Sequence, residues 1–337
     1  MSVSESALQR RLVTIPALFV AGPVLVIAIP IWLPIALLVD AVRLRWRFPI
    51  TRLLAFGVCW TWLEISAIAL SFGVWLTGQA HNQALHYALQ RWWARQLLGA
   101  LRLTCGIEVD AVNVAAFTPG PVVLFVRHAS LADSLVSAYV LTSLAHLHPH
   151  YVLKKELLID PCLDVVGNRI PNYFLDRGTN DSAPELAAVQ RLVHGLATDE
   201  AGVIFPEGTR ANPAKRAAAL ARIGERDPAR AARLARLRHL LPPRPSGALA
   251  MHTGAPDADV VLAWHVGFEG LDTFGGILQA LNRPFAPIRF VARRVASDDV
   301  PHGSEFTAWL DGEWLRMDAE VDDALAERDG RQHMREH

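Results

Sequence analysis

The chain has 337 residues, which allows one large domain with an appended segment. Its 33 Lys and Arg residues balance its 33 Asp and Glu residues, so net charge favours neither nucleic acid nor an acidic partner. The three cysteines form no Cys-x-x-Cys motif, which argues against a disulfide framework or a zinc site and fits a reducing compartment.

The first 80 residues have the composition of a membrane anchor. Residues 12–39 contain no charged side chain, and the run is long enough to cross a bilayer and too long for the core of a signal peptide. A second apolar run, residues 53–76, contains one acid, Glu64. Buried core helices are the alternative, but so long an uncharged run is unusual for them. We therefore predict membrane attachment through these two segments.

The connection between the two runs is rich in arginine: Arg43, Arg45, Arg47 and Arg52. Positive-inside bias places this loop in the cytosol. Prolines interrupt residues 12–39, and Glu64 is costly in hydrocarbon, so one or both segments are expected to enter a leaflet without spanning it. The loop and the rest of the chain would then share the cytoplasmic face. The Ala- and Arg-rich composition favours a bacterial inner membrane.

Residues 79–103 are predicted to form a helix that carries both tryptophan and arginine. Trp92 lies on its apolar side, while Arg91 and Arg95 are available for phosphates. This combination suits the headgroup region of a bilayer. A helix packed on the downstream domain shows the same pattern, so both interpretations stay open.

From residue 120 the pattern changes to strands that alternate with helices. Residues 121–126, 201–206 and 259–266 are short and apolar, as buried strands are, and helical patterns such as 183–198 lie between them. The alternation predicts an α/β fold with a mixed, largely parallel sheet flanked by helices. Functional residues are expected at the strand ends.

Three histidines are followed five residues later by an aspartate: His128–Asp133, His194–Asp199 and His252–Asp257. Within a helix, residues five apart point about 140° away from each other. The second pair straddles a predicted helix end, and the third flanks a predicted turn that contains Gly and Pro. His128, however, directly follows a buried strand, and Ser130 offers an N-cap for the next helix. His128 can therefore fold back toward Asp133, which makes this pair the catalytic candidate.

The segment FPEGTR, residues 205–210, completes a recognisable pattern with HASLAD, residues 128–133. Together they resemble the motifs of glycerophospholipid acyltransferases, the family of the lysophosphatidic acid acyltransferases. Further blocks resemble this family in the same order: LKKELL (153–158), NYFLDRG (172–178), LPPRPSGALA (241–250), DVVLAWHVGFEG (259–270) and FTAWLDGEWLRMDAE (306–320). The last three resemble the branch that includes eukaryotic lysophosphatidate and lysocardiolipin acyltransferases. Where many members have Val-Pro, this chain reads LAWHV (262–266).

The resemblance implies acyl transfer from a thioester to a lipid hydroxyl. His128 would be the general base, worth about 10²–10⁴-fold in rate, and Asp133 would fix its tautomer and stabilise the imidazolium. The acceptor hydroxyl replaces an enzyme nucleophile, and the chain has no Gly-x-Ser-x-Gly motif. We therefore predict direct transfer without an acyl-enzyme.

A lysophosphatidate acceptor presents a phosphate, which guanidinium groups bind well. The resemblance assigns this role to Arg177 and Arg210, although an ordinary surface ion pair is the alternative for Arg177. The remaining substrate-binding candidates are Lys155, Glu207, Gly208 and Thr209.

The predicted activity is that of a 1-acylglycerol-3-phosphate O-acyltransferase that makes phosphatidate. Acyl-CoA or acyl carrier protein would be the donor, as a co-substrate; no cofactor and no metal are expected, and the oligomeric state is open. His146 and His148 have no acidic or cysteine ligand beside them. The alternatives are an acyltransferase for lysophosphatidylglycerol or lysocardiolipin, a hydrolase with the same His–Asp pair, and a silent lipid-binding protein. The motif residues disfavour the silent protein, and the arginines disfavour the hydrolase.

Four regions are expected along the chain. They are a membrane anchor (1–80), a connecting helix (81–119), a catalytic domain (120–300) with an Ala/Arg-rich insertion (211–240), and an acidic C-terminal helix and tail (301–337). The insertion is either a basic arm for lipid or coenzyme A phosphates or a solvated helical segment.

The orientation of the arginine-rich loop can be tested with a cysteine at Trp46. In a variant without Cys59, Cys105 and Cys162, we expect Trp46→Cys to escape a membrane-impermeant maleimide added to intact cells, because the loop is cytosolic. The thiol should react once the cells are opened. Labelling from outside intact cells would contradict the cytosolic loop.

Overall fold

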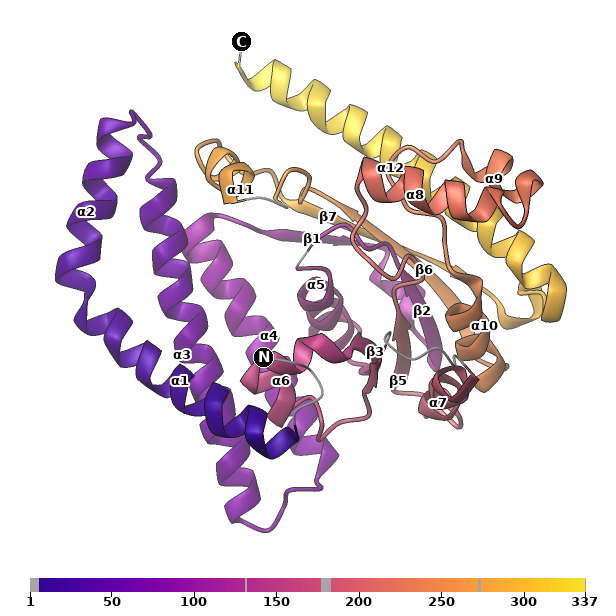
Figure 1. Cartoon of the computed structure of the whole chain (residues 1–337), viewed down its shortest axis with the longest axis horizontal. Helices are drawn as coiled ribbons and strands as arrows, with labels where there is room; N and C mark the ends of the chain where they lie inside the picture. Colours follow the sequence, from indigo (N-terminus) through magenta and orange to yellow (C-terminus); the bar gives the residue numbers. More distant parts are fainter. Residues whose placement is uncertain (1–5, 131, 177–182, 272–273, 337) are drawn as a thin grey trace. The chain divides into compact units, whose positions relative to one another are not determined.

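The computed structural model describes residues 6–130, 132–176, 183–271 and 274–336 (Figure 1). The chain divides into two compact units that interleave along the sequence. The first contains Met1–Val109, Leu135–Asn180 and Gly270–Pro287, and the second contains Asp110–Ser134, Asp181–Glu269 and Ile288–His337. Each unit therefore combines segments that are far apart in the chain.

The first unit begins with helices formed by the apolar segments. They are α1 (Ala7–Ile27), α2 (Ile29–Val42), α3 (Pro49–Leu76) and α4 (Gln83–Cys105). The predicted segment 12–39 is thus two helices, and Figure 1 shows the bend between them. Pro30 lies in the first turn of α2, where its missing N–H removes no helical hydrogen bond.

Two of these helices, α1 and α3, are long and apolar enough to cross a membrane. Their most apolar windows are 11% and 17% buried, so most of this surface faces outward. Large side chains such as Leu12, Val20 and Trp62 are exposed. A surface of this kind marks contact with a membrane or a partner rather than with water. The two helices support the predicted membrane attachment.

Helix α4 packs along α3 inside the first unit. Its N-cap residue is Asn82, whose side chain accepts the N–H of Leu85. A small core joins α3 and α4 to α6 (Pro161–Val165), with Trp92 and Trp93 packed against it. One side of the helix predicted over 79–103 is therefore packed against other parts of the protein. This feature agrees with the interpretation of a packed helix. The core residues are Ala67, Ile68, Leu89, Cys162 and Val166.

The rest of the first unit is short elements. The parallel pair β3 (His148–Lys154) and β4 (Tyr173–Leu175) is its sheet component. A π-helix (Val140–Leu144) and a 3-10 helix (Lys155–Ile159) pack against β3, whereas α11 (Phe274–Leu281) packs against α3.

The second unit contains the main sheet, with the strand order β1-β7-β6-β2-β5. Strand β2 pairs in parallel with both β5 and β6, while β7 is antiparallel to β6. All five residues of β2 are fully buried, which explains its uniformly apolar sequence. The strands are β1 (Val109–Val112), β2 (Val122–Val126), β5 (Glu200–Ile204), β6 (Asp259–Val266) and β7 (Ile288–Val295).

Helices α7, α10 and α12 pack against this sheet. Helix α10 approaches α7 closely at Gly254, where a Cβ would lie 2.4 Å from the carbonyl oxygen of Gln190. The predicted fold class is confirmed: a mixed, largely parallel sheet flanked by helices. The helices of this unit and its 3-10 turns are α7 (Ala183–Val193), α10 (Pro245–Gly254), α12 (Phe306–Glu336), Val114–Phe117, Ser297–Asp299 and Gly303–Glu305.

The basic insertion forms α8 (Pro213–Gly224) and α9 (Pro228–Leu234), which behave differently. No residue of α8 is buried. In α9, Arg230 and Arg233 bind the buried Asp311 of α12 at 2.8 and 3.1 Å. The α9 end of the insertion is therefore docked on the acidic helix, whereas α8 is solvated.

Candidate functional site

The carboxyl ends of three neighbouring strands bring the candidate residues together in the second unit. His128 follows β2, and Glu207 follows β5. His265 is the next-to-last residue of β6. Because β2 pairs in parallel with both neighbours, these ends lie at one edge of the sheet. The sheet topology thus assembles polar side chains from distant parts of the sequence.

His128 and Asp133 are in contact, and Asp133 begins α5 (Asp133–Tyr139). The Nδ1 atom of His128 lies 2.7 Å from Oδ2 of Asp133. The same carboxylate accepts the backbone N–H groups of Ala129 and Ser130, at 2.7 and 2.9 Å, and the Ser130 hydroxyl. The carboxylate side chain is 1% exposed and the imidazole 17% exposed. A carboxylate on Nδ1 keeps the proton there, which leaves Nε2 as the basic nitrogen.

Glu207 lies behind His128 with a 1% exposed side chain. Its Oε1 accepts the backbone N–H of His128 at 2.8 Å, and its Oε2 accepts that of Leu241 at 2.9 Å. Burial raises the pKa of Glu207 to about 8, against the opposing effects of these two N–H groups and of Arg127. The carboxyl group therefore fastens two backbone segments together, one of which carries the candidate base.

The remaining residues of the FPEGTR motif form a tight turn beside His128. Gly208 has a φ of +71°, which favours glycine, and its N–H donates to the carbonyl of Phe205 at 2.9 Å. Lys215 of α8 donates to the hydroxyl of Thr209 and to the carbonyl of Arg210, both at 3.2 Å. Positive charge from Arg210 and Lys215 is thus gathered at this turn.

Two of the candidate phosphate ligands, Lys155 and Arg177, belong to other segments of the chain. Lys155 belongs to the first unit, where it forms an ion pair of 2.8 Å with the partly exposed Asp176. Arg177 lies outside the residues that the structure describes. Within the described ranges, no group of three His, Cys, Asp or Glu residues could hold a metal ion.

The other two His–Asp pairs have different surroundings. His194 is exposed just beyond the end of α7. His252 is buried in α10 and stacks on His302 at 4.8 Å, while Asp257 is exposed. Burial, together with His302, lowers the pKa of His252 and favours its neutral form.

Sequence reasoning missed one member of the site, His265. Its Nε2 lies 2.8 Å from Oδ1 of Asp133, and its side chain is 0% exposed. Asp133 therefore holds two imidazoles, one on each oxygen. Burial opposes ionisation of Asp133, but His265 and His128 outweigh it and hold its pKa below the usual range. The available signal was the LAWHV segment, which departs from the Val-Pro pattern at this strand.

Comparisons with known proteins concern the sequence family and the fold. Residues 109–263 match the model of the Acyltransferase family. The chain is similar in structure to the 1-acyl-sn-glycerophosphate (LPA) acyltransferase PlsC from Thermotoga maritima, with a TM-score of 0.55 and 13% sequence identity. The match covers 82% of this chain and 98% of that one, and it establishes the fold. Comparison with curated protein sequences gave no match.

Replacing Glu207 should change how stability depends on pH. Burial raises its pKa from 4.5 to about 8, so between these values the folded protein keeps a proton that the unfolded chain releases. This group therefore contributes stability that is complete below pH 4.5 and is lost as the pH rises to about 8. Glutamine stays neutral, so the unfolding midpoint of Glu207→Gln should rise relative to wild type through this window.

Tryptophan-fluorescence melts in detergent measure this difference. Glu225→Gln, at an exposed position on the solvated side of the insertion, is the matched control and should show no such trend. A Glu207→Gln difference that stays constant between pH 4.5 and 8 would contradict the raised pKa.

Proposed function

We propose that the chain is a glycerophospholipid acyltransferase that transfers a fatty acyl group from acyl-CoA to the hydroxyl of a lysophospholipid, as the match of residues 109–263 to the Acyltransferase family model supports. The proposed acceptor is 1-acylglycerol-3-phosphate, and the product is phosphatidate. The observation that carries this proposal is the 2.7 Å contact between His128 and Asp133 at the end of a buried parallel strand. It provides a partly exposed base whose proton-bearing nitrogen is fixed by a carboxylate.

In the proposed reaction, Nε2 of His128 takes the proton of the acceptor hydroxyl as its oxygen attacks the thioester carbonyl. A carbon–oxygen bond forms, and the tetrahedral intermediate then collapses with cleavage of the carbon–sulfur bond. The proton on Nε2 passes to the leaving thiolate, which departs as free coenzyme A. Asp133 stays ionised and stabilises the imidazolium between these steps. No acyl-enzyme is formed.

The acceptor phosphate is proposed to bind at the turn that follows β5. Arg210 supplies a guanidinium there, and Lys215 adds a second positive charge on the same backbone segment. Arg177 is proposed as a further ligand from the resemblance of its motif, and Gly208 and Thr209 shape the turn. Glu207 acts beneath the site by holding the backbone of His128.

The proposed location is a membrane surface, with α1 and α3 as the attachment and the catalytic unit on the cytoplasmic face of a bacterial inner membrane. This position gives access to an acceptor that resides in the bilayer and to a soluble donor. Acyl carrier protein is the alternative donor, and lysophosphatidylglycerol and lysocardiolipin are alternative acceptors.

His128→Ala tests the proposed base. Detergent-purified wild type should release thiol from oleoyl-CoA when lysophosphatidate is present, and the variant should lose about 10²–10⁴-fold of this rate. His194→Ala is the matched control, because His194 is exposed at the end of α7, and it should keep the wild-type rate.

The other outcomes separate the alternatives. Release that does not need the acceptor would identify a thioesterase, and trapping of a covalent acyl group on the protein would contradict direct transfer. If oleoyl-CoA gives no release, acyl carrier protein is tested as the donor. Failure with both donors would contradict the acyltransferase assignment.

A further inference from the structure

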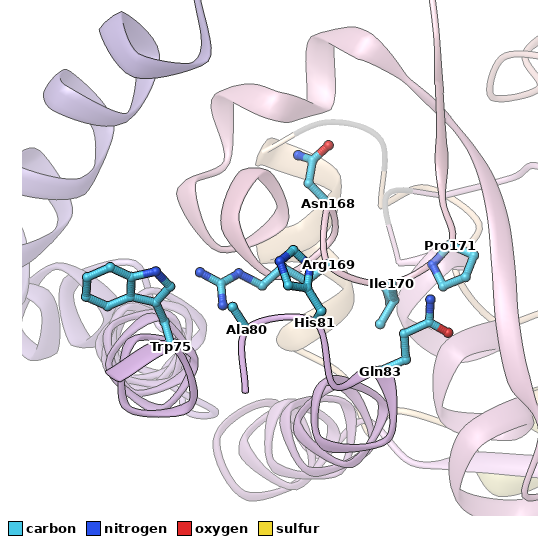
Figure 2. A pocket seen from close by; sticks show the side chains of 8 residues that line it. All are labelled: Trp75, Ala80, His81, Gln83, Asn168, Arg169, Ile170 and Pro171. Carbon is cyan, nitrogen blue, oxygen red and sulfur yellow. The ribbon is translucent and has the colours of Figure 1, made fainter. Parts of the chain in front are cut away.

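A cavity of about 560 Å³ lies in the first unit, where α3 ends, α4 begins and the loop after α6 passes (Figure 2). Its lining includes Trp75, His81, Gln83 and Arg169. Figure 2 shows Arg169 in the wall of the pocket, with its guanidinium directed to the side of Trp75. None of these residues belongs to the candidate site at the carboxyl ends of β2, β5 and β6. The cavity therefore needs a separate explanation.

Arg169 lacks a counter-ion among the residues that the structure describes. Its Nη1 is buried and has no hydrogen-bond partner in that part of the chain. A buried guanidinium N–H without an acceptor is costly, more so than a neutral one. Burial lowers the pKa of Arg169, and the nearby positive charge of Arg11 lowers it further.

The buried acid of the preceding helix α6, Asp164, already binds two other arginines. Asp164 binds Arg10 through both carboxylate oxygens, at 3.0 and 3.1 Å, and Arg11 at 3.1 Å. Arg11, which also acts on Arg169, is thus already paired with Asp164. The excess positive charge at Arg169 faces the cavity, which suits an anion.

Two further features identify the kind of anion. Helix α4 begins at Gln83 on the cavity wall, and the N-terminal N–H groups of a helix attract phosphate. Trp75 lies in the last turn of the apolar helix α3, half-exposed and stacked on Phe72. Aromatic side chains at the end of such a helix are typical of the headgroup level of a bilayer. A lipid phosphate is present at that level.

We propose that this cavity binds the phosphate group of an anionic phospholipid, with Arg169 as its counter-ion. His81 and the first N–H groups of α4 complete the set of donors. The site would hold the first unit against the membrane surface independently of acyl transfer, so its test does not depend on the proposed function.

Native mass spectrometry of the full-length protein in neutral detergent tests this site, with dihexanoyl phosphatidate as the probe. Wild type should bind one more phosphatidate than Arg169→Gln, whose affinity at this site should fall about tenfold or more. Arg283→Gln, an equal charge change at an exposed position of the first unit outside the cavity, is the matched control and should bind like wild type. Arg169→Lys keeps the charge and should retain part of the affinity.

Two results would overturn the proposal. One is equal binding of phosphatidate by wild type and a folded Arg169→Gln, judged by an unchanged melting curve. The other is displacement of phosphatidate by inorganic phosphate at equal concentration, which would identify free phosphate as the ligand. If Arg169→Gln does not fold, an Arg169→Lys protein that binds no more weakly than Arg283→Lys contradicts the proposed contact.

A second inference concerns His265, and it rests on the proposed function. Asp133 uses Oδ2 for His128 and Ala129, and Oδ1 for His265 and Ser130. Nδ1 of His265 is buried without a partner in the described chain, so the neutral form with its proton on Nε2 fits the site. Arg127 holds the backbone carbonyl of His265 through Nη1.

We infer that His265 is a positioning residue that donates to Asp133 and thereby sets both its orientation and its pull on His128. The donated hydrogen bond withdraws negative charge from the carboxylate, so less of that charge acts on the imidazolium of His128. Loss of the donor should therefore favour the imidazolium and move the acidic limb of the pH–rate profile to higher pH.

His265→Leu and His265→Gln separate positioning from packing. The leucine variant should lower kcat about tenfold or more with little change in the acceptor KM, and should shift the profile, whereas glutamine can donate and should restore part of both. His252→Leu removes an equally buried histidine of the same unit and is the control for loss of stability.

A readout without turnover distinguishes failure of this inference from failure of the proposed function. Peptide mapping of diethyl pyrocarbonate modification follows the neutral fraction of His128 as a function of pH. Its midpoint should move to higher pH in His265→Leu and stay in place in His252→Leu. An unchanged midpoint would overturn the role of His265, whatever the enzyme's activity.

Discussion

The site depends on the burial of one carboxylate, that of Asp133. Removing a charged group from water is unfavourable unless hydrogen bonds replace its hydration. Here two imidazoles, two backbone N–H groups and a hydroxyl donate to its two oxygens. These donors come from the loop after β2 and from β6, so the carboxylate fixes the loop, the start of α5 and the neighbouring strand in one arrangement. His128, which contacts this carboxylate, is therefore held in a fixed position as well.

A second buried carboxyl group supports the same loop from behind. Glu207 joins the backbone of His128 to that of Leu241, so the position of His128 is coupled to the turn after β5 and to the segment that leads into α10. The pKa values of the two acids shift in opposite directions. At Asp133 the two imidazoles outweigh burial and lower the pKa, whereas at Glu207 burial dominates and raises the pKa. One carboxylate stays charged beside His128, and the other acts mainly through hydrogen bonds to the backbone.

The neutral net charge of the chain conceals local imbalances that the fold resolves in different ways. In the second unit, Asp311 of α12 takes up the positive charge of α9, so part of the basic insertion is a docked structural element. In the first unit, Asp164 is shared by Arg10 and Arg11, and Arg169 has no acid of its own among the described residues. The positive charge of α9 is therefore balanced within the protein by Asp311. That of Arg169 is proposed to be balanced by a bound ligand.

The sequence by itself determined the elements whose signals are local. Nearly complete burial makes β2, β5 and β6 mostly apolar, and the spacing from His128 to Asp133 lies within one loop and helix start. The apolar run 12–39 was predicted as one segment but forms two helices. Prolines permit an interruption of the helix, and a hydropathy pattern does not reveal it. Only the tertiary structure decided that His265 reaches Asp133 and that Glu207 faces backbone rather than solvent. Those contacts depend on strand pairing and register between segments up to 132 residues apart, which no local pattern encodes.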